Sequence, residues 1–178
     1  MYIYSGFIRR IMPQKANTIT TVKDEYHIIG ISYQLRDYRL SFSINKALHF
    51  QLKKIPDFEF RKSGSDIVRN FSMYFFNDND FLNTYCLLAN HSDNIYLIPT
   101  HKQIDYFFII SGQVKPERFQ MCLKSLKTIP QVLTAIVIDT DKTAQLEQLI
   151  PDIDSHITAC LDQNKSGFLK LKTPNIPK

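Results

Sequence analysis

The longest unbroken apolar runs in this chain of 178 residues contain five residues, and one of them is 106–110. A helix that crosses a bilayer needs about 20 such residues, so the sequence predicts no membrane span. Short runs rich in β-branched and aromatic residues are typical of buried strands, and 104–111 is the most β-prone segment of the chain. With 44% hydrophobic and 22% charged residues, the composition is that of a globular domain with one core.

Several other short β-prone segments are bounded by the residues that favour turns. They predict strands over 26–32, 55–60, 70–76, 81–89, 95–99, 104–111 and 132–138. Short turns join the strands between residues 55 and 99, so we expect these strands to pair antiparallel.

Two segments repeat their apolar residues with the period of a helix. The first covers 35–49, and the second begins at Pro116 and extends to 127. The strand, helix and strand of 104–138 would form a parallel crossover unit. Because each helix must bury one apolar stripe, the sequence predicts an α+β fold with a mainly antiparallel sheet and both helices on one face.

The chain divides by its patterning into three parts. Residues 1–23 predict an irregular, basic N-terminal arm, 24–140 the α+β domain, and 141–178 a C-terminal helical extension that ends in a loose tail. The extension carries an amphipathic stripe that Pro151 interrupts, which predicts two short helices or one kinked helix. An exposed stripe of this size would be unfavourable, so we expect it to dock on the domain or on a partner. Its apolar residues are Leu146, Leu149, Ile150, Ile153, Ile157, Cys160 and Leu161.

The net charge of +5 suggests nucleic-acid binding, but its distribution weakens that hypothesis. Four basic and no acidic residues lie in 1–23, whereas 24–140 contains 13 basic and 12 acidic residues. A nearly neutral domain lacks the positive surface that a phosphate backbone requires. RNA association through the arm is therefore kept as an alternative.

Three widely spaced cysteines, Cys86, Cys122 and Cys160, form no CxxC pair, which favours reduced thiols and a cytoplasmic protein. Arg9 and Arg10 follow the first apolar stretch, which is not the order of a signal peptide. The sequence contains no P-loop, GxGxxG, HExxH or GxSxG motif, and its histidines lack metal-ligand spacing. We therefore expect no cofactor and no metal site.

Two segments carry a family resemblance. The sequence Ile98-Pro-Thr-His-Lys-Gln-Ile-Asp-Tyr106 resembles the signature of the bacterial IPExxxVDY family, and 37–40 with 44–48 resembles an earlier segment of that family. Thr100 and Ile104 depart from the signature, where the family has Glu and Val. The resemblance covers roughly 24–140 and implies no established activity. Candidate binding residues within these segments are Asp37, Arg39, Asn45, Pro99, Lys102 and Tyr106.

Asp105 is the most informative polar residue of the signature. Alternation along a strand places its carboxylate on the face of Phe107 and Ile109, where a charge needs a partner. We expect an ion pair with Arg39 or hydrogen bonds from backbone donors. The alternative is an acid/base carboxylate that burial tunes and that acts with His101.

The function that best fits these observations is a non-enzymatic binding or protein-interaction module, with a protein partner or a second copy of the chain. One alternative is an enzyme with an acid/base site at Asp105 and His101. The other is an RNA-associated protein that uses the basic arm.

Overall fold

The computed structural model describes residues 26–61, 67–93, 95–139 and 143–170, with the side chains of 164–170 excepted. The predicted basic arm lies outside these residues, as does the end of the tail. The described elements, in chain order, are β1 (Tyr26–Ser32), α1 (Asp37–Leu48), β2 (Lys53–Arg61), β3 (Val68–Asp78), β4 (Asn83–Ala89), β5 (His91–Ser92), β6 (Ile95–Tyr96), the short 3-10 helix η1 (Pro99–His101), β7 (Tyr106–Gly112), α2 (Pro116–Thr128), β8 (Thr134–Ile138) and α3 (Ala144–Lys170).

Six strands form one sheet in the order β2-β3-β4-β7-β1-β8, and every neighbouring pair is antiparallel. Strands β5 and β6 form a separate two-stranded ribbon. Both β7 and β8 are antiparallel to β1, so they are parallel to each other, as the predicted crossover requires. Strand β1 lies between them, however, so the crossover through α2 joins strands that are not neighbours.

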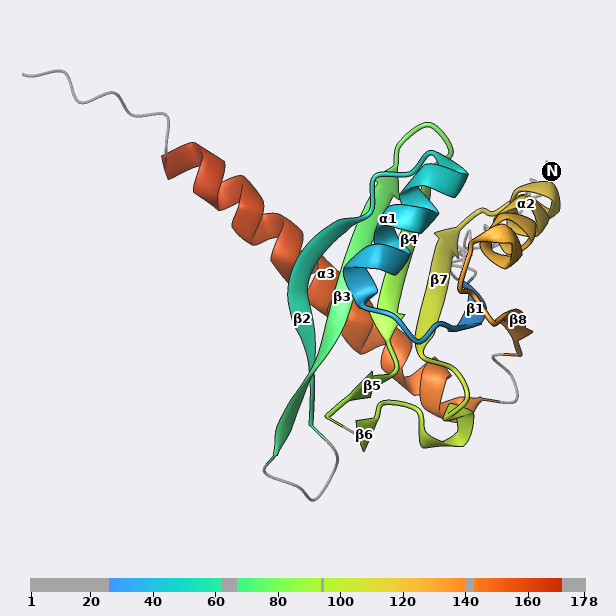
Figure 1. Ribbon diagram of the computed structural model, residues 1–178. Coiled ribbons are helices and arrows are strands. Elements are labelled where there is room, and N and C mark those ends of the chain that lie inside the picture. Colours follow the sequence, from blue (N-terminus) through green and yellow to red (C-terminus); the bar gives the residue numbers. More distant parts are fainter. Residues whose placement is uncertain (1–25, 62–66, 94, 140–142, 171–178) are drawn as a thin grey trace, which may run out of the picture.

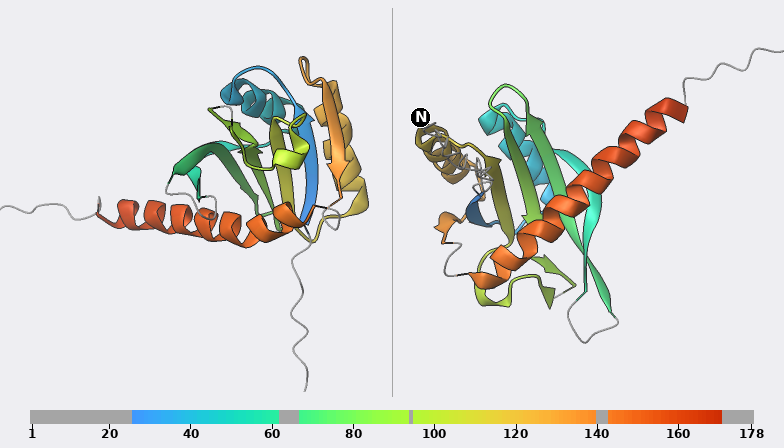
Figure 2. Two further views of the ribbon diagram at one scale, coloured as in Figure 1. Left: turned by 90° about the horizontal axis from the view of Figure 1, so that it is seen from below. Right: turned by 180° about the vertical axis from the view of Figure 1, so that it is seen from behind.

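The helices cover both faces of the sheet (Figures 1 and 2). Helices α1 and α2 share one core with Ile29 and Phe108, which confirms the predicted placement of both on one face. Helix α3 covers the opposite face, where it packs on Ile28 and Phe107. Adjacent residues of β1 and β7 enter different cores because side chains alternate along a strand. The fold is α+β, with the C-terminal helix as a third layer.

Helix α3 docks the apolar stripe that the sequence predicted. Leu146, Leu149, Ile150 and Ile153 are buried in the second core, and Cys160 is buried further along the helix. Pro151 lies inside the helix, which continues on both sides of it. The structure thus has one helix here, and packing offsets the backbone hydrogen bond that proline cannot make.

One predicted strand differs from the structure. The predicted strand 95–99 is reduced to β6, because Pro99 begins η1, and β6 pairs with the short strand β5. Gly30 makes room for the side chains of Ile138 and Ile104, since a Cβ there would lie 2.9 and 3.0 Å from their Cδ1 atoms. Side chains, and not another backbone, approach this glycine.

Among the described helices, none combines the length and the apolar character that a membrane crossing requires.

The two buried residues that anchor α2 most deeply are Cys122 and Leu126, whereas Phe119 and Leu123 are partly buried at the edge of the same core.

The packing of α3 yields a stability prediction. Ile153 is 2% exposed, so Ile153→Ala should lower the free energy of unfolding by about 2–5 kcal/mol. Gln148→Ala, on the exposed side of the same helix, should change it by less than about 0.5 kcal/mol. Urea denaturation of both variants measures the difference, and equal midpoints would show that α3 does not pack on the sheet in solution.

Candidate functional site

A groove follows the loop between β1 and α1. One part, of about 610 Å³, lies between this loop and the sheet, and the other, of about 590 Å³, lies along α1. Leu35, Tyr38 and Arg39 line both parts, and we call the whole the α1 groove. Its other residues are Gln34, Arg36, Asp37, Ser72, Ala89, His91 and Tyr106 in the first part, and Tyr33, Ser41, Phe42, Ser43, Asn45 and Gln131 in the second.

The groove contains four of the candidate binding residues that the sequence singled out. Asp37, Arg39 and Tyr106 line the first part or both, and Asn45 lines the second. The structure places Pro99 at the start of η1 and Lys102 just after it, where the Lys102 ammonium lies 6.0 Å from the Tyr96 ring centre. These two residues are not among those that line the groove.

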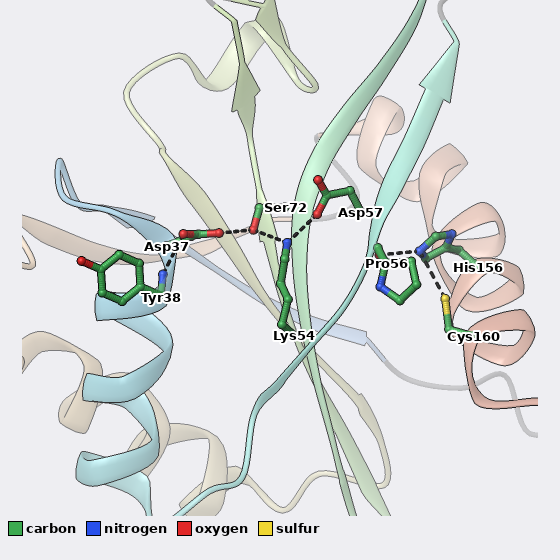
Figure 3. A network of polar contacts seen from close by, with 8 residues as sticks. All are labelled: Asp37, Tyr38, Lys54, Pro56, Asp57, Ser72, His156 and Cys160. Carbon is green, nitrogen blue, oxygen red and sulfur yellow. Dashed lines mark hydrogen bonds and ion pairs between the residues drawn. The ribbon is translucent and has the colours of Figure 1, made fainter. Parts of the chain in front are cut away.

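Asp37 is held in place by donors from α1 and β3, and Lys54 of β2 supports one of them (Figure 3). Its carboxylate accepts hydrogen bonds from the Tyr38 N–H at 2.8 Å and from the Ser72 hydroxyl of β3. Lys54 of β2 donates to the same Ser72 oxygen at 2.8 Å and pairs with Asp57. Burial opposes the ionisation of Asp37, but these donors and the Lys54 charge outweigh it and lower the pKa of the carboxyl below 3.8.

Two tyrosines behind the groove remain protonated far above neutral pH. Burial, followed by the charge of Asp37 and a hydrogen bond to it, raises the pKa of Tyr74 to about 12. Burial is also the main cause that raises the pKa of Tyr106, whose hydroxyl donates to the Leu35 carbonyl at 3.3 Å. Both phenols therefore act as hydrogen-bond donors and not as bases.

Asp105 ties β7 to the start of the loop that forms the groove. Its carboxylate accepts the Tyr33 N–H at 2.6 Å and the Ser32 hydroxyl at 3.2 Å, and its own N–H donates to the Ile31 carbonyl at 2.9 Å. The prediction of backbone donors is therefore correct. The imidazole of His91 is also nearby, with its Nε2 at 3.8 Å from Asp105 Oδ1.

Arg39 was the preferred partner of Asp105, and that prediction is wrong. The Arg39 guanidinium donates to the Tyr38 hydroxyl at 3.4 Å, and no ion pair joins it to Asp105. Asp105 instead contacts the end of β1 and Tyr33, four residues before α1 begins, because β1 lies directly beside β7 in the sheet. The sequence could not show this neighbour relationship.

The predicted acid/base pair of Asp105 and His101 is not assembled. The Nδ1 atom of His101 lies 3.0 Å from the Thr100 hydroxyl, and its ring packs edge-on against Phe107. The imidazole beside Asp105 belongs to His91, and 3.8 Å is too long for a hydrogen bond that would orient a catalytic base.

Asn90 is the key residue that sequence reasoning missed. It is fully buried, and its amide donates to the carbonyls of His101 and Ile104 at 2.9 and 2.8 Å while accepting the Ile98 N–H at 2.8 Å. Its backbone N–H donates to the Asp105 carbonyl at 2.8 Å. The segment that resembles the family signature therefore wraps around one amide side chain. The available signal was an asparagine directly after an apolar strand.

Asn45 has a comparable role at the other end of α1. Its amide donates to the Leu52 carbonyl at 3.1 Å and accepts the Leu52 N–H at 2.8 Å, which holds the turn between α1 and β2. The side-chain amide of this candidate binding residue is therefore already hydrogen-bonded to the backbone of Leu52.

The chemistry of the thiols and of metal binding is limited in the described residues. Burial raises the pKa of Cys122 to about 11 and that of Cys86 further still, so neither thiol is a nucleophile near neutral pH. In the ranges that the structure describes, no three His, Cys, Asp or Glu side chains cluster closely enough to hold a metal ion.

The open face of the groove combines arginine with exposed apolar side chains. Leu35, just before α1, is 39% exposed, and Tyr38 and Phe42, one turn apart in α1, are 55% and 69% exposed. Arg36 and Arg39 are exposed beside them, and no carboxylate within the described part of the chain pairs with either guanidinium. This surface offers two donor groups for an anion next to apolar contact area.

No family model matches the chain, and comparisons with curated proteins and with solved structures find no similar protein. The resemblance to the IPExxxVDY family stays a prediction. The site must be interpreted from its own geometry.

The position of Asn90 predicts a large effect on stability. Asn90→Ala removes three side-chain hydrogen bonds and leaves buried backbone groups of Ile98 and Ile104 without partners, so we expect a loss of about 2–5 kcal/mol. Gln103→Ala, at an exposed position of the same loop, should cost less than about 0.5 kcal/mol. Chemical denaturation distinguishes the two, and a mild effect at Asn90 would contradict its central role.

The lowered pKa of Asp37 predicts a pH dependence. Its folded-state value lies below the ordinary 3.8, so the carboxylate stabilises the fold above that pH and loses this contribution as pH falls through the folded value. Asp37→Asn should therefore be less stable than wild type at neutral pH, and the difference should shrink below about pH 4.

Urea denaturation at several pH values measures this difference. Asp152→Asn, at an exposed position of α3, is the matched control and should follow the wild type at each pH. A deficit of Asp37→Asn that stays constant with pH would show that the charge of Asp37 does not stabilise the fold.

Proposed function

We propose that this protein is a non-enzymatic interaction module that binds an acidic, partly apolar segment of a protein partner in the α1 groove. The observation that carries the proposal is the pairing of two exposed guanidinium groups, Arg36 and Arg39, with exposed Tyr38 and Phe42. Arginine and aromatic residues are the types that dominate binding energy at protein interfaces.

The charges near the groove support an anionic ligand. The carboxylates of Asp37 and Asp105 both accept hydrogen bonds from the protein itself. Ser72 and Tyr38 donate to Asp37, and Tyr33 donates to Asp105. The guanidinium groups are at the surface, where a carboxylate of a partner would accept two parallel hydrogen bonds. An acidic peptide therefore complements the groove better than a basic one.

The arrangement of the signature residues also favours binding over catalysis. Ile98 and Ile104 bind the side chain of Asn90, and Asp105 binds Tyr33 in the loop that leads to α1. These residues of the signature segment therefore have a structural role beside the groove. An acid/base site at Asp105 would have to use His91 in place of His101. One oxygen of the Asp105 carboxylate already accepts the Tyr33 N–H, which makes this alternative less favourable. We further propose, from the three separate thiols, that the protein is cytoplasmic and bacterial, as the family resemblance implies.

Selection from a random peptide library tests the proposal. Peptides that bind the wild-type protein are retained, and those that also bind an Arg36→Glu/Arg39→Glu variant are removed. We expect the remaining sequences to be rich in Asp and Glu next to an aromatic or aliphatic residue. Binding should weaken with added salt, because the contacts are exposed charges.

A selected peptide then gives a quantitative prediction. Arg39→Glu should reduce its affinity at least about tenfold, because an attraction becomes a repulsion. Lys124→Glu, which makes the same charge change at an exposed position of α2, should leave the affinity within about twofold. Fluorescence anisotropy measures both. Peptides without acidic residues, or equal binding to both variants, would refute the proposal.

A further inference from the structure

The two edges of the sheet are protected very differently. The outer strand at one end, β2, contains Lys53, Lys54, Pro56, Asp57, Glu59 and Arg61. Its register with β3 shifts between Ile55 and Phe58, and the Pro56 carbonyl lies 2.9 Å from His156 Nε2 of α3 (Figure 3). Charge, proline, a bulge and a covering helix are the devices that prevent an edge strand from pairing with another chain.

Strand β8, at the opposite edge, lacks the charges, the proline and the bulge within its described residues, although α2 packs on one face of it. Its sequence, Thr134–Ile138, contains no charged residue and no proline, and its pairing with β1 continues without a register shift. Ile136 and Val137 are 41% and 52% exposed, and Leu133 just before the strand is 66% exposed. An uncharged, apolar edge of this kind is a template for another strand.

We propose that β8 pairs antiparallel with β8 of a second copy of this chain, so that two six-stranded sheets join into one. A two-fold axis at Ile136 places this residue opposite Ile136 of the partner subunit, and it places Thr134 opposite Ile138 of the partner subunit. Paired residues then differ by an even number of positions, so each pair lies on one face of the joined sheet.

In this arrangement the partner strand covers exposed side chains of β8 on both faces of the sheet. Ile136 pairs with Gly30 of β1, so it lies on the sheet face of α3, and Val137 pairs with Ile29 on the face of α1 and α2. The two-fold axis brings the two copies of Ile136 together, places Val137 opposite Ala135 of the partner subunit, and sets no like charges opposite each other. A second copy suits this edge because the strand is complementary to itself and carries no charge that would select an acidic or basic partner.

The size of the contact predicts its strength. Five paired residues and a few side chains bury less than the roughly 1,200–2,000 Å² of a stable interface. We therefore expect a dimer that forms with rising concentration, within the micromolar range. The α1 groove is not part of this edge, so dimer formation and peptide binding are separate properties.

Sedimentation of the full chain over a concentration series tests the proposal. The wild type should shift from monomer to dimer, and Ile136→Lys should stay monomeric over the same range because it places two charges opposite each other. Glu59→Lys, a charge change on the β2 edge, should dimerise like the wild type. Circular dichroism should show that each variant is folded, as is expected for exposed positions.

Cross-linking gives the register directly. Under a mild oxidant, Ile136→Cys should form a disulfide-linked dimer, because the two-fold axis brings the two copies of position 136 together. Thr134→Cys, two positions along, should not form one, since it faces position 138 of the partner subunit. A wild type that is monomeric throughout, a dimer that survives Ile136→Lys, or equal cross-linking at both positions would overturn the proposal.

Discussion

The hydrogen bonds that join Asn90, Asp105 and the end of β1 are the contacts on which the rest of the structure depends. Asn90 organises the loop from Ile98 to Ile104, and its N–H donates to the carbonyl of Asp105. Asp105 in turn accepts the N–H of Tyr33, the first residue of the loop that leads from β1 to α1. Because these hydrogen bonds pair the buried polar groups of the loop, the loop has one conformation and the groove beside it has a defined shape.

The same arrangement explains the electrostatics of the groove. The carboxylates of Asp37 and Asp105 could suggest catalysis. Each one, however, already accepts hydrogen bonds from backbone or hydroxyl donors of the protein. The side chains that remain available to a ligand are Arg36, Arg39 and the exposed aromatic residues of α1. A site whose acids are internally paired and whose cations are open is suited to recognition of an anion.

The two edges of the sheet differ in the features that keep an edge strand from pairing with another chain. Strand β2 is charged, bulged and contacted by α3, whereas β8 is short, uncharged and apolar. In a monomer the second edge would be a liability, since unpaired backbone groups invite other strands. Self-pairing at this edge would convert the liability into a symmetric interface and leave the α1 groove of each copy open.

Local patterns were sufficient to predict the periodic elements, because helical and strand periods depend on nearby residues. The helix within 35–49, the apolar stripe around Ile153 and the strand within 104–111 all agree with the structure. The sequence also indicated that Asp105 needs donors, since a carboxylate among apolar residues is costly. The position of β1 between β7 and β8, the bond from Tyr33 to Asp105 and the proximity of His91 to Asp105 became visible in the fold alone. The physical reason is that strand order depends on contacts between distant segments, and a periodic pattern specifies which face is buried but not which neighbour buries it.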